Sequence, residues 1–361
     1  MKKACLLALV LLSACALCAC GYSSLERQTF AICMSVDRLE DGQIKLGLQA
    51  PKSGQSAEGG LTADYEVITA TGDSPKEALR LLAATTPYPI NFCQLRLVLL
   101  RYELAASAEL RSLLRFLQEL PTMRPNATVM VALGDAQAVM EAQTPEFGMR
   151  LSTHLNILLQ RLQAQALLPM STLSHCVQLI GSGYGDPLLC VCAVNPTLEQ
   201  QQKKEQESDK GSSGGSSQPA YAEGEPWNES LLPEDLLAGM LPRTSGNPVE
   251  YLGSATVSDG RVSGLLSASE TQLVLRALNE AVKRVAISPS GVQLQLLLDK
   301  DSVLDADRDK LGQAVKIVQA LDCDALCFGE AALSAFVTDA DWDAFAFHRQ
   351  YKQAELAIGV K

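Results

Sequence analysis

The chain has 361 residues, of which 47% are hydrophobic and 20% charged, a globular balance with room for two or three compact domains. Its 41 acidic and 30 basic residues give a formal net charge of −11, which argues against a nucleic-acid-binding surface and against binding to anionic lipid headgroups by charge alone. Beyond the N-terminal segment no uncharged apolar stretch reaches about 18 residues, so we expect no later segment to span a bilayer.

The N-terminus is typical of a secretory signal. A basic start at residues 1–3 precedes an apolar run over residues 4–19, which is too short to span a bilayer, and small residues precede Cys20. Residues 12–15 (Leu-Ser-Ala-Cys) fit a lipobox, and residues 17–20 (Leu-Cys-Ala-Cys) fit a second one. In bacterial lipoproteins this cysteine is acylated and becomes the new N-terminus, so acyl chains hold the chain at a membrane. The alternatives are an ordinary signal peptide and an N-terminal anchor, and local chemistry alone favours Cys15 over Cys20.

The first half of the mature chain alternates between strand and helix signals. Period-2 alternation and continuous apolar runs predict strands over residues 29–37, 43–49, 65–71, 91–100, 128–133 and 188–194. Asp41-Gly42 marks a hairpin turn between the first two strands. Helical spacing and capping residues predict helices from Pro75, over 103–119, after Asp135 and over 148–166. We therefore expect residues 20–196 to form an N-terminal α/β domain.

The composition changes sharply after this half. Between residues 199 and 225 the only apolar side chains are those of Ala220, Tyr221 and Ala222. Such a segment buries too little apolar surface to offset the entropy lost on ordering. We predict a disordered, low-complexity linker over residues 197–247, with a short apolar helix near 229–241.

The last part of the chain has its own set of signals. Strands are predicted over residues 251–257 and 261–266 around the turn dipeptide Asp259-Gly260. A helix around residues 274–281, a strand over 292–298, a helix over 311–318 and a strand over 354–360 follow. We expect residues 248–361 to form a C-terminal α+β domain. The predicted fold class is thus α/β and α+β, with mixed β-sheets and packed helices in two domains.

Cysteines dominate the residues that could carry chemistry. If Cys20 is acylated, seven remain, and Cys33, Cys93, Cys190 and Cys192 lie in apolar strand-like runs where a buried free thiol is the favoured interpretation. Cys323 and Cys327 are spaced for a disulfide or for half of a metal site, and the sequence leaves their redox state open. The chain has three histidines and none is near this pair at ligand spacing, so we expect no metal site.

No enzymatic constellation is visible. His154 lies on a leucine-rich predicted helix and His175 lies beside Cys176, so both are interpreted as structural. No P-loop, nucleophile elbow or zinc spacing occurs, and the glycine-rich residues 181–185 open no helix as a dinucleotide site would. We therefore expect no catalytic residues, no cofactor and no enzyme activity.

A series of short fragments resembles the Ger(x)C family, the lipoprotein C subunits of bacterial spore germinant receptors. In the first half the fragments are Cys20-Gly21-Tyr22, Ser35-Val36-Asp37, Asp41-Gly42, Gly72-Asp73-Ser74 and Glu77-Ala78-Leu79, followed by residues 92–99, 103–105, 124–127 and 134–136. In the second half they are residues 252–257, residues 260–266 and the pair Glu270-Thr271. The chain departs from the pattern at Ser35, where glycine is common, in its long linker and in its short C-terminal domain.

The resemblance implies a non-enzymatic subunit, lipid-anchored on the outer face of the spore inner membrane. It implies integral-membrane receptor subunits as partners and shifts the expected acylation site from Cys15 to Cys20, while the germinant stays unknown. Glu270-Thr271 matches a family pair, although the residues themselves favour a helix start capped by Ser267 or Ser269. A lipid-anchored solute-binding protein of a transporter is the alternative function, and a lipid-anchored hydrolase is a weaker one.

Overall fold

A mixed eight-stranded sheet runs through most of the molecule. The computed structural model describes residues 27–51, 65–143, 145, 149–195, 247–288, 291–300 and 307–361. In this part of the chain the strand order is β10-β9-β8-β7-β6-β2-β3-β4. The bounds are β10 (Arg261–Leu266), β9 (Val249–Ser258), β8 (Leu188–Val194), β7 (Thr128–Ala132), β6 (Leu97–Arg101), β2 (Cys33–Arg38), β3 (Ile44–Pro51) and β4 (Tyr65–Gly72).

The four central strands of this sheet are parallel. β2 pairs with β6, β6 with β7 and β7 with β8 in parallel, whereas the outer pairs on both sides are antiparallel. Nearly every residue of β6, β7 and β8 is buried, as expected for parallel strands covered on both faces. This explains why these strands read as continuous apolar runs instead of alternating ones.

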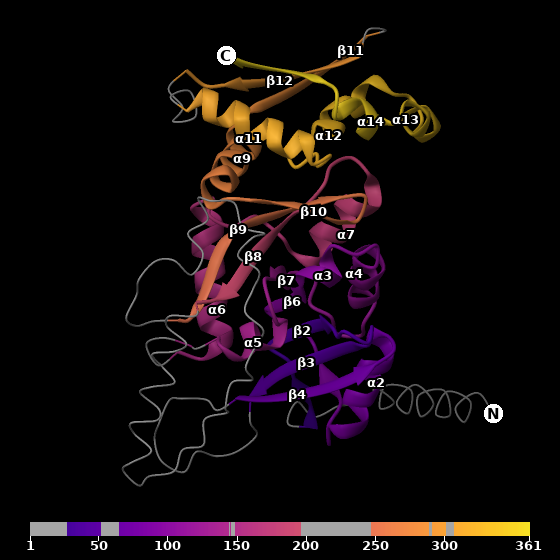
Figure 1. The fold of residues 1–361 in the computed structure, drawn as a ribbon, viewed down its shortest axis with the longest axis vertical. Coiled ribbons are helices and arrows are strands. Elements are labelled where there is room, and N and C mark those ends of the chain that lie inside the picture. Colours follow the sequence, from indigo (N-terminus) through magenta and orange to yellow (C-terminus); the bar gives the residue numbers. More distant parts are fainter. Residues whose placement is uncertain are drawn as a thin grey trace, which may run out of the picture.

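Helices cover both faces of the sheet (Figure 1). One face packs against α2 (Pro75–Thr85), α3 (Tyr102–Ala105), α4 (Leu110–Gln118) and α7 (Leu173–Ser182). The other face packs against α5 (Ala136–Glu141) and α6 (Leu151–Ala164). On α4 the residues Leu110, Leu113, Leu114 and Leu117 are all buried, so the stripe at helical spacing is the face that contacts the sheet.

A smaller sheet and its helices form a separate core at the other end of the molecule (Figure 1). β11 (Val282–Ser288) and β12 (Gly291–Leu298) are antiparallel, and β13 (Glu355–Val360) lies parallel to β12. The longer helices here are α9 (Ala268–Glu280) and α11 (Arg308–Ala320). Shorter ones follow: α12 (Phe328–Ala332), η3 (Leu333–Ala335), α13 (Asp339–Phe345) and α14 (Phe347–Tyr351). The predicted mixture of α/β and α+β sheets with packed helices is confirmed.

The large sheet continues across the predicted start of the C-terminal domain at residue 248. β9 pairs antiparallel with β8, from Leu188 opposite Thr256 to Val194 opposite Val249, and β10 pairs with β9. The first two strands assigned to the C-terminal domain therefore extend the sheet of the N-terminal half. The domain division remains a prediction, and the predicted linker with its short helix lies outside the described residues, apart from Asn247.

Two predicted elements are wrong in detail because polar side chains interrupt them. The strand expected over 91–100 is split into β5 (Ile90–Asn91) and β6, since the Asn91 side chain accepts a hydrogen bond from the Cys93 backbone at 2.9 Å and turns the chain. The helix expected over 103–119 is split into α3 and α4. There the Ser107 hydroxyl bonds to the Leu104 carbonyl at 2.7 Å and competes with the helix.

Replacing Gly253 by alanine is expected to lower the free energy of unfolding by about 2 kcal/mol. Gly253 lies in β9 with a φ of +119°, and an added Cβ would run into the Leu266 carbonyl oxygen where β10 meets α9. Urea denaturation of the mature chain measures the change. The control is Gly181→Ala on α7, where an added Cβ meets nothing within 4 Å. Unfolding of the Gly253→Ala chain at the parent's urea midpoint would contradict this packing.

Candidate functional site

The residues expected to carry an acyl group, Cys20 and its alternative Cys15, lie outside the described residues. Among the residues that the structure does describe, no helix has the length and apolar character needed to cross a bilayer. The functional geometry available is therefore that of the folded part, and hydrogen bonds between two buried aspartates join its two cores.

Two loops that are far apart in the sequence meet between the large sheet and the smaller one. We call residues 183–187 and 321–327 the loop joint. The Asp186 backbone N–H donates to the Asp324 carbonyl at 3.0 Å, and the Asp324 N–H donates to the Asp186 carboxylate Oδ2 at 2.8 Å. Because each aspartate both donates and accepts, the pair fixes the α7–β8 connection against the α11–α12 connection.

Asp324 lies at the centre of the loop joint and is fully buried. Its carboxylate accepts hydrogen bonds from the backbone N–H groups of Phe328 (2.9 Å) and Gly329 (2.7 Å), the first residues of α12. Burial raises the pKa of Asp324 to about 7, and the nearby Asp186 charge adds to this, although the two N–H donors favour the ionised form. The side chain thus binds the first two backbone N–H groups of α12, while its burial disfavours the ionised carboxylate.

Asp186 is the second buried carboxyl of the loop joint. Burial raises its pKa to about 6, against the opposing effects of the Asp324 N–H and of His348. His348 on α14 places its Nδ1 3.7 Å from the Asp186 Oδ2, so α14 also contacts the joint. Gly185 lets the two loops of the joint lie close together, because a Cβ at this position would lie only 2.8 Å from the Cys327 sulfur.

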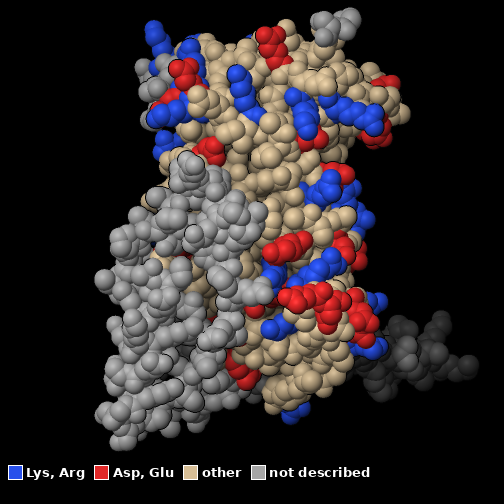
Figure 2. Space-filling model, viewed as in Figure 1, with Lys and Arg blue, Asp and Glu red and all other residues tan. Residues whose placement is uncertain are grey.

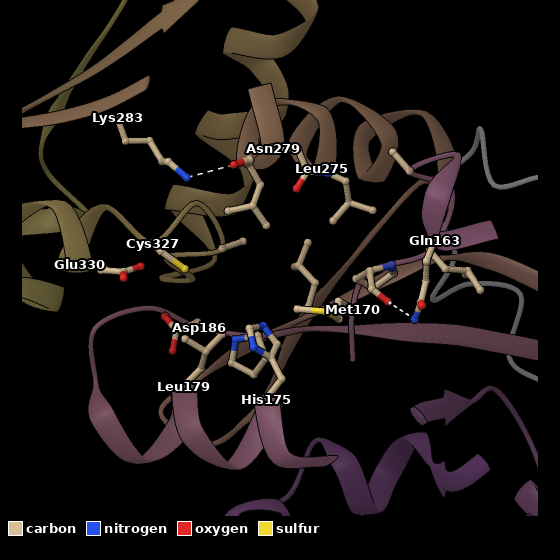
Figure 3. Close-up of a pocket in the computed structure, with 17 residues that line it drawn as sticks. Gln163, Met170, His175, Leu179, Asp186, Leu275, Asn279, Lys283, Cys327 and Glu330 are labelled. Atoms are coloured by element: carbon tan, nitrogen blue, oxygen red, sulfur yellow. Dashed lines mark hydrogen bonds between the residues drawn. The ribbon is translucent and has the colours of Figure 1, made fainter. Parts of the chain in front are cut away.

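A cavity of about 410 Å³ opens beside the loop joint (Figure 3). Its lining comes from both cores, and the labelled side chains in Figure 3 show His175 and Leu179 on α7 facing Leu275 and Asn279 on α9. The lining is mixed: Leu168, Pro169, Leu188 and Ala325 are apolar, whereas Lys283, Glu330 and Asp186 are charged. Asp186 therefore belongs both to the loop joint and to the cavity wall.

The groups around this cavity are poorly suited to nucleophilic chemistry. Burial raises the pKa of the Cys327 thiol to about 12, and burial lowers the pKa of His175. A protonated thiol is a weak nucleophile and a weak metal ligand. Within the described ranges, no group of three or more His, Cys, Asp or Glu side chains is arranged to hold a metal ion.

The cysteines follow the sequence expectation with one exception. Cys33, Cys176, Cys190, Cys192 and Cys323 are buried free thiols. Cys323 and Cys327 are both free thiols in this structure. Cys93 was expected to be buried and is exposed, because the turn at Asn91 takes it out of the strand.

A third buried aspartate organises the N-terminal half. Asp37 near the end of β2 accepts hydrogen bonds from the backbone N–H groups of Ala136 (2.7 Å) and Gln137 (3.2 Å), where α5 begins. Burial raises its pKa to about 7, and the charge of Asp135 adds to the shift. Because α5 lies against β2, we interpret Asp37 as the residue that fixes α5 on the sheet.

The pair Glu270-Thr271 has the structural role that the residues favoured. Ser267 caps α9 by accepting from the Glu270 N–H at 3.1 Å, while the Glu270 carboxylate accepts from the Ser267 N–H at 2.8 Å. The Thr271 hydroxyl lies 2.8 Å from the buried Ser254 hydroxyl of β9. The pair therefore caps α9 and fixes it to the large sheet.

Sequence reasoning missed the three buried aspartates. Asp186 and Asp324 are 138 residues apart, and nothing in the pattern of either segment indicates that they meet. Asp37 could have been singled out from the sequence, because it stands at the end of an apolar strand, and a carboxylate buried there requires hydrogen-bond donors. His154 is buried on α6 and His175 is half-buried on α7, so the two predicted structural histidines are not brought together.

Comparison with known proteins gives a family match for the first half. Residues 21–194 match the family described as spore germination protein N-terminal domain. Among solved structures, the chain is similar to one titled "Crystal Structure of the GerBC protein", at 12% identity, over 91% of this chain and 95% of that chain, with a TM-score of 0.42. The identity and the TM-score are too low for this structural likeness to carry an argument. No curated protein matches the chain. The family match confirms the resemblance that the sequence fragments predicted.

The free energy of unfolding is expected to fall as the pH rises from about 4 to 8. Asp37, Asp186 and Asp324 have folded pKa values raised from 3.8 to about 7, 6 and 7, so the folded chain holds protons that the unfolded chain has released. Their contribution is fully present below pH 3.8 and is lost as the pH rises through 6 to 7. Each unit of such a shift corresponds to about 1.4 kcal/mol, and denaturation at several pH values measures the total.

Two variants test the origin of this pH dependence. Asp186→Asn should reduce it, because it removes one of the three titrating carboxyls, whereas Asp299→Asn, an exposed carboxylate of the smaller core, should leave it unchanged. Stability that rises between pH 5 and 8, or an Asp186→Asn chain with the parent's pH dependence, would contradict the account of the loop joint.

Alkylation under native conditions should single out Cys93 among the seven described cysteines. Thiol reagents need access and a thiolate, and the other six are buried or, for Cys327, partly buried with a raised pKa. Peptide mass spectrometry after brief iodoacetamide treatment should find at least tenfold more label on Cys93 than on Cys33 or Cys190. In urea all seven should react alike. Equal native labelling of Cys190 would show that β8 is not in the buried sheet.

Proposed function

The chain belongs to the Ger(x)C family of spore germination proteins, and from that premise we propose that it is a lipid-anchored subunit of a spore germinant receptor. The observation that carries the proposal is the family match over residues 21–194, which covers the sheet from β2 to β8 and its helices. The fragments 252–257 and 260–266, which form β9 and β10, support it, because they extend this same sheet.

The proposed anchor is a lipid on Cys20. Support comes from the basic start, the apolar run over residues 4–19 and the small residues before Cys20. A single acyl chain gives reversible membrane binding, so a diacylglyceryl group or a second contact is needed for stable attachment. The proposed location is the outer face of the spore inner membrane.

The proposed partners are the integral-membrane subunits of the receptor, and the proposed role is one of binding without catalysis. The protonated thiols and the separate histidines favour such a role, because neither supplies an activated nucleophile. The loop joint supports it as well, since it holds the two cores in one arrangement that a partner could recognise. We propose no cofactor.

The alternative, a solute-binding protein of a transporter, fits the fold less well. Such a protein was expected to have two α/β lobes around a ligand cleft. In this chain β8 and β9 are antiparallel neighbours, so strands from both halves share one sheet instead of forming two lobes. The cavity beside the loop joint is the place where a small solute would have to bind under this alternative.

The acylation site is tested by mass spectrometry of the N-terminal peptide. The mature chain is expected to begin at Cys20 with a diacylglyceryl group, because the signal peptide ends at residue 19. Cys20→Ser should abolish the acyl mass and leave residues 1–19 attached, whereas the matched variant Cys15→Ser should be processed normally. A diacylglyceryl group on Cys15 would refute the choice of site, and an unmodified chain would refute the lipoprotein.

The receptor role is tested by germination. Spores that lack this chain and other chains of its family should lose their response to nutrients, and the parent chain should restore it. The Cys20→Ser chain should restore much less. An unchanged nutrient response without any chain of the family would contradict the proposed function.

A further inference from the structure

The chain enters its fold at one defined place. Arg27, the first described residue, lies seven residues after Cys20, a stretch that spans at most about 24 Å. Thr29 then pairs with Ile90, because β1 (Thr29–Phe30) lies parallel to β5, and the Thr29 N–H donates to the Pro89 carbonyl at 2.9 Å. The entering chain is thus fixed beside the connection between α2 and β5.

This connection carries an unusual pair of side chains. Across the described residues between 27 and 143, Leu81 and Tyr88 are the large hydrophobic side chains that are exposed, at 41% and 39%. Both lie within eight residues of each other, on the second half of α2 and on the connection that follows it. Ala78 and Leu82 of α2 face the core, so Leu81 is not needed for packing against the sheet.

Basic side chains accompany this pair. Arg27, Lys76 and Arg80 are exposed on the same segments. The nearby acidic side chains accept hydrogen bonds at the start of α2: Glu77 accepts from the Asp73 N–H at 3.0 Å, and Asp73, two residues before α2, accepts from the Gln43 side chain at 3.2 Å. The face of the molecule in Figure 2 carries both basic and acidic side chains.

We propose that this entry surface, formed by Arg27, Lys76, Arg80, Leu81 and Tyr88, rests on the lipid surface into which the acyl chains of Cys20 insert. The inference rests on the lipid anchor of the proposed function and adds which face of the protein meets the membrane. Leucine and tyrosine suit the boundary between headgroups and acyl chains, and arginine and lysine suit anionic headgroups. The short connection to Cys20 keeps these weak contacts at a high effective concentration.

The proposal fixes the orientation of the whole molecule. Figure 1 shows α2 and β4 at one end of the longest axis and the sheet β11-β12-β13 at the other. With the entry surface on the lipid, the loop joint and the smaller core point away from the membrane. Those parts are then free to meet the extracytoplasmic regions of a membrane-embedded partner.

Cys93 is a native reporter for this test, because it is exposed and follows β5 by two residues. A fluorophore on Cys93 of the lipidated chain, in vesicles of phosphatidylcholine and phosphatidylglycerol, is exposed to lipids with a nitroxide on the headgroup. The control carries Cys93→Ser and Val337→Cys, which places the label at a residue that is 94% exposed in the smaller core. We expect at least threefold stronger quenching at Cys93 than at residue 337.

Flotation of the same samples separates the two claims. Equal, weak quenching at both positions on chains that float with the vesicles would overturn the membrane-facing surface and leave the lipid anchor intact. That result combined with protection of Cys93 from alkylation in native membranes would assign the surface to a protein partner instead. Chains that do not float would refute the anchor and the surface together.

Side-chain variants test the contact itself. Leu81→Ser with Tyr88→Ser should reduce quenching at Cys93 at least twofold and weaken vesicle binding of the unacylated mature chain roughly tenfold, equivalent to about 1.4 kcal/mol. The control is Val337→Ser, which removes an apolar side chain that is 94% exposed at the far end. Far-ultraviolet circular dichroism confirms that all variants fold. Unchanged quenching in the Leu81 and Tyr88 variant would overturn the proposal.

Discussion

The pairing of β8 with β9 is the constraint on which the rest of the structure depends. These strands come from opposite sides of residues 196–246, and their register runs from Leu188 opposite Thr256 to Val194 opposite Val249. Once β9 is placed, Ser254 positions α9 through Thr271, and Asp186, two residues before β8, meets Asp324. The segment that matches the family, residues 21–194, thereby shares one larger sheet with β9 and β10, and this sheet also supports the smaller core.

Much of the fold could be predicted because its signals are local. The strands β7 and β8 are buried on both faces and appear in the sequence as apolar runs, and Asp41-Gly42 and Asp259-Gly260 mark the β2–β3 and β9–β10 hairpins. The sequence predicted a cap at Ser267 or Ser269 for the helix near Glu270-Thr271, and Ser267 is the residue that caps α9. The predicted strand and helix that proved to be split are interrupted by the side chains of Asn91 and Ser107, which form hydrogen bonds with nearby backbone groups. The short helices α12 to α14 were missed because five to seven residues show too little periodicity.

The site could be predicted far less well, because it is made by long-range contacts. No sequence pattern places β9 in the first sheet instead of the second, and therefore none places Asp186 beside Asp324. The buried aspartates share one feature: each carboxylate accepts hydrogen bonds from the backbone of a distant segment, so each stabilises a tertiary contact while opposing its own ionisation. Such residues make the arrangement of elements sensitive to pH in a way that apolar packing is not.

The central claim is that this chain acts as a lipid-anchored subunit beside integral-membrane proteins. The most direct measurement is affinity purification of the tagged, full chain from detergent-solubilised spore membranes, followed by mass spectrometry of everything retained. The account predicts multi-span membrane proteins in amounts comparable to the chain itself, retained after washing at high salt. Recovery of the chain alone, from membranes in which those proteins are present, would contradict it.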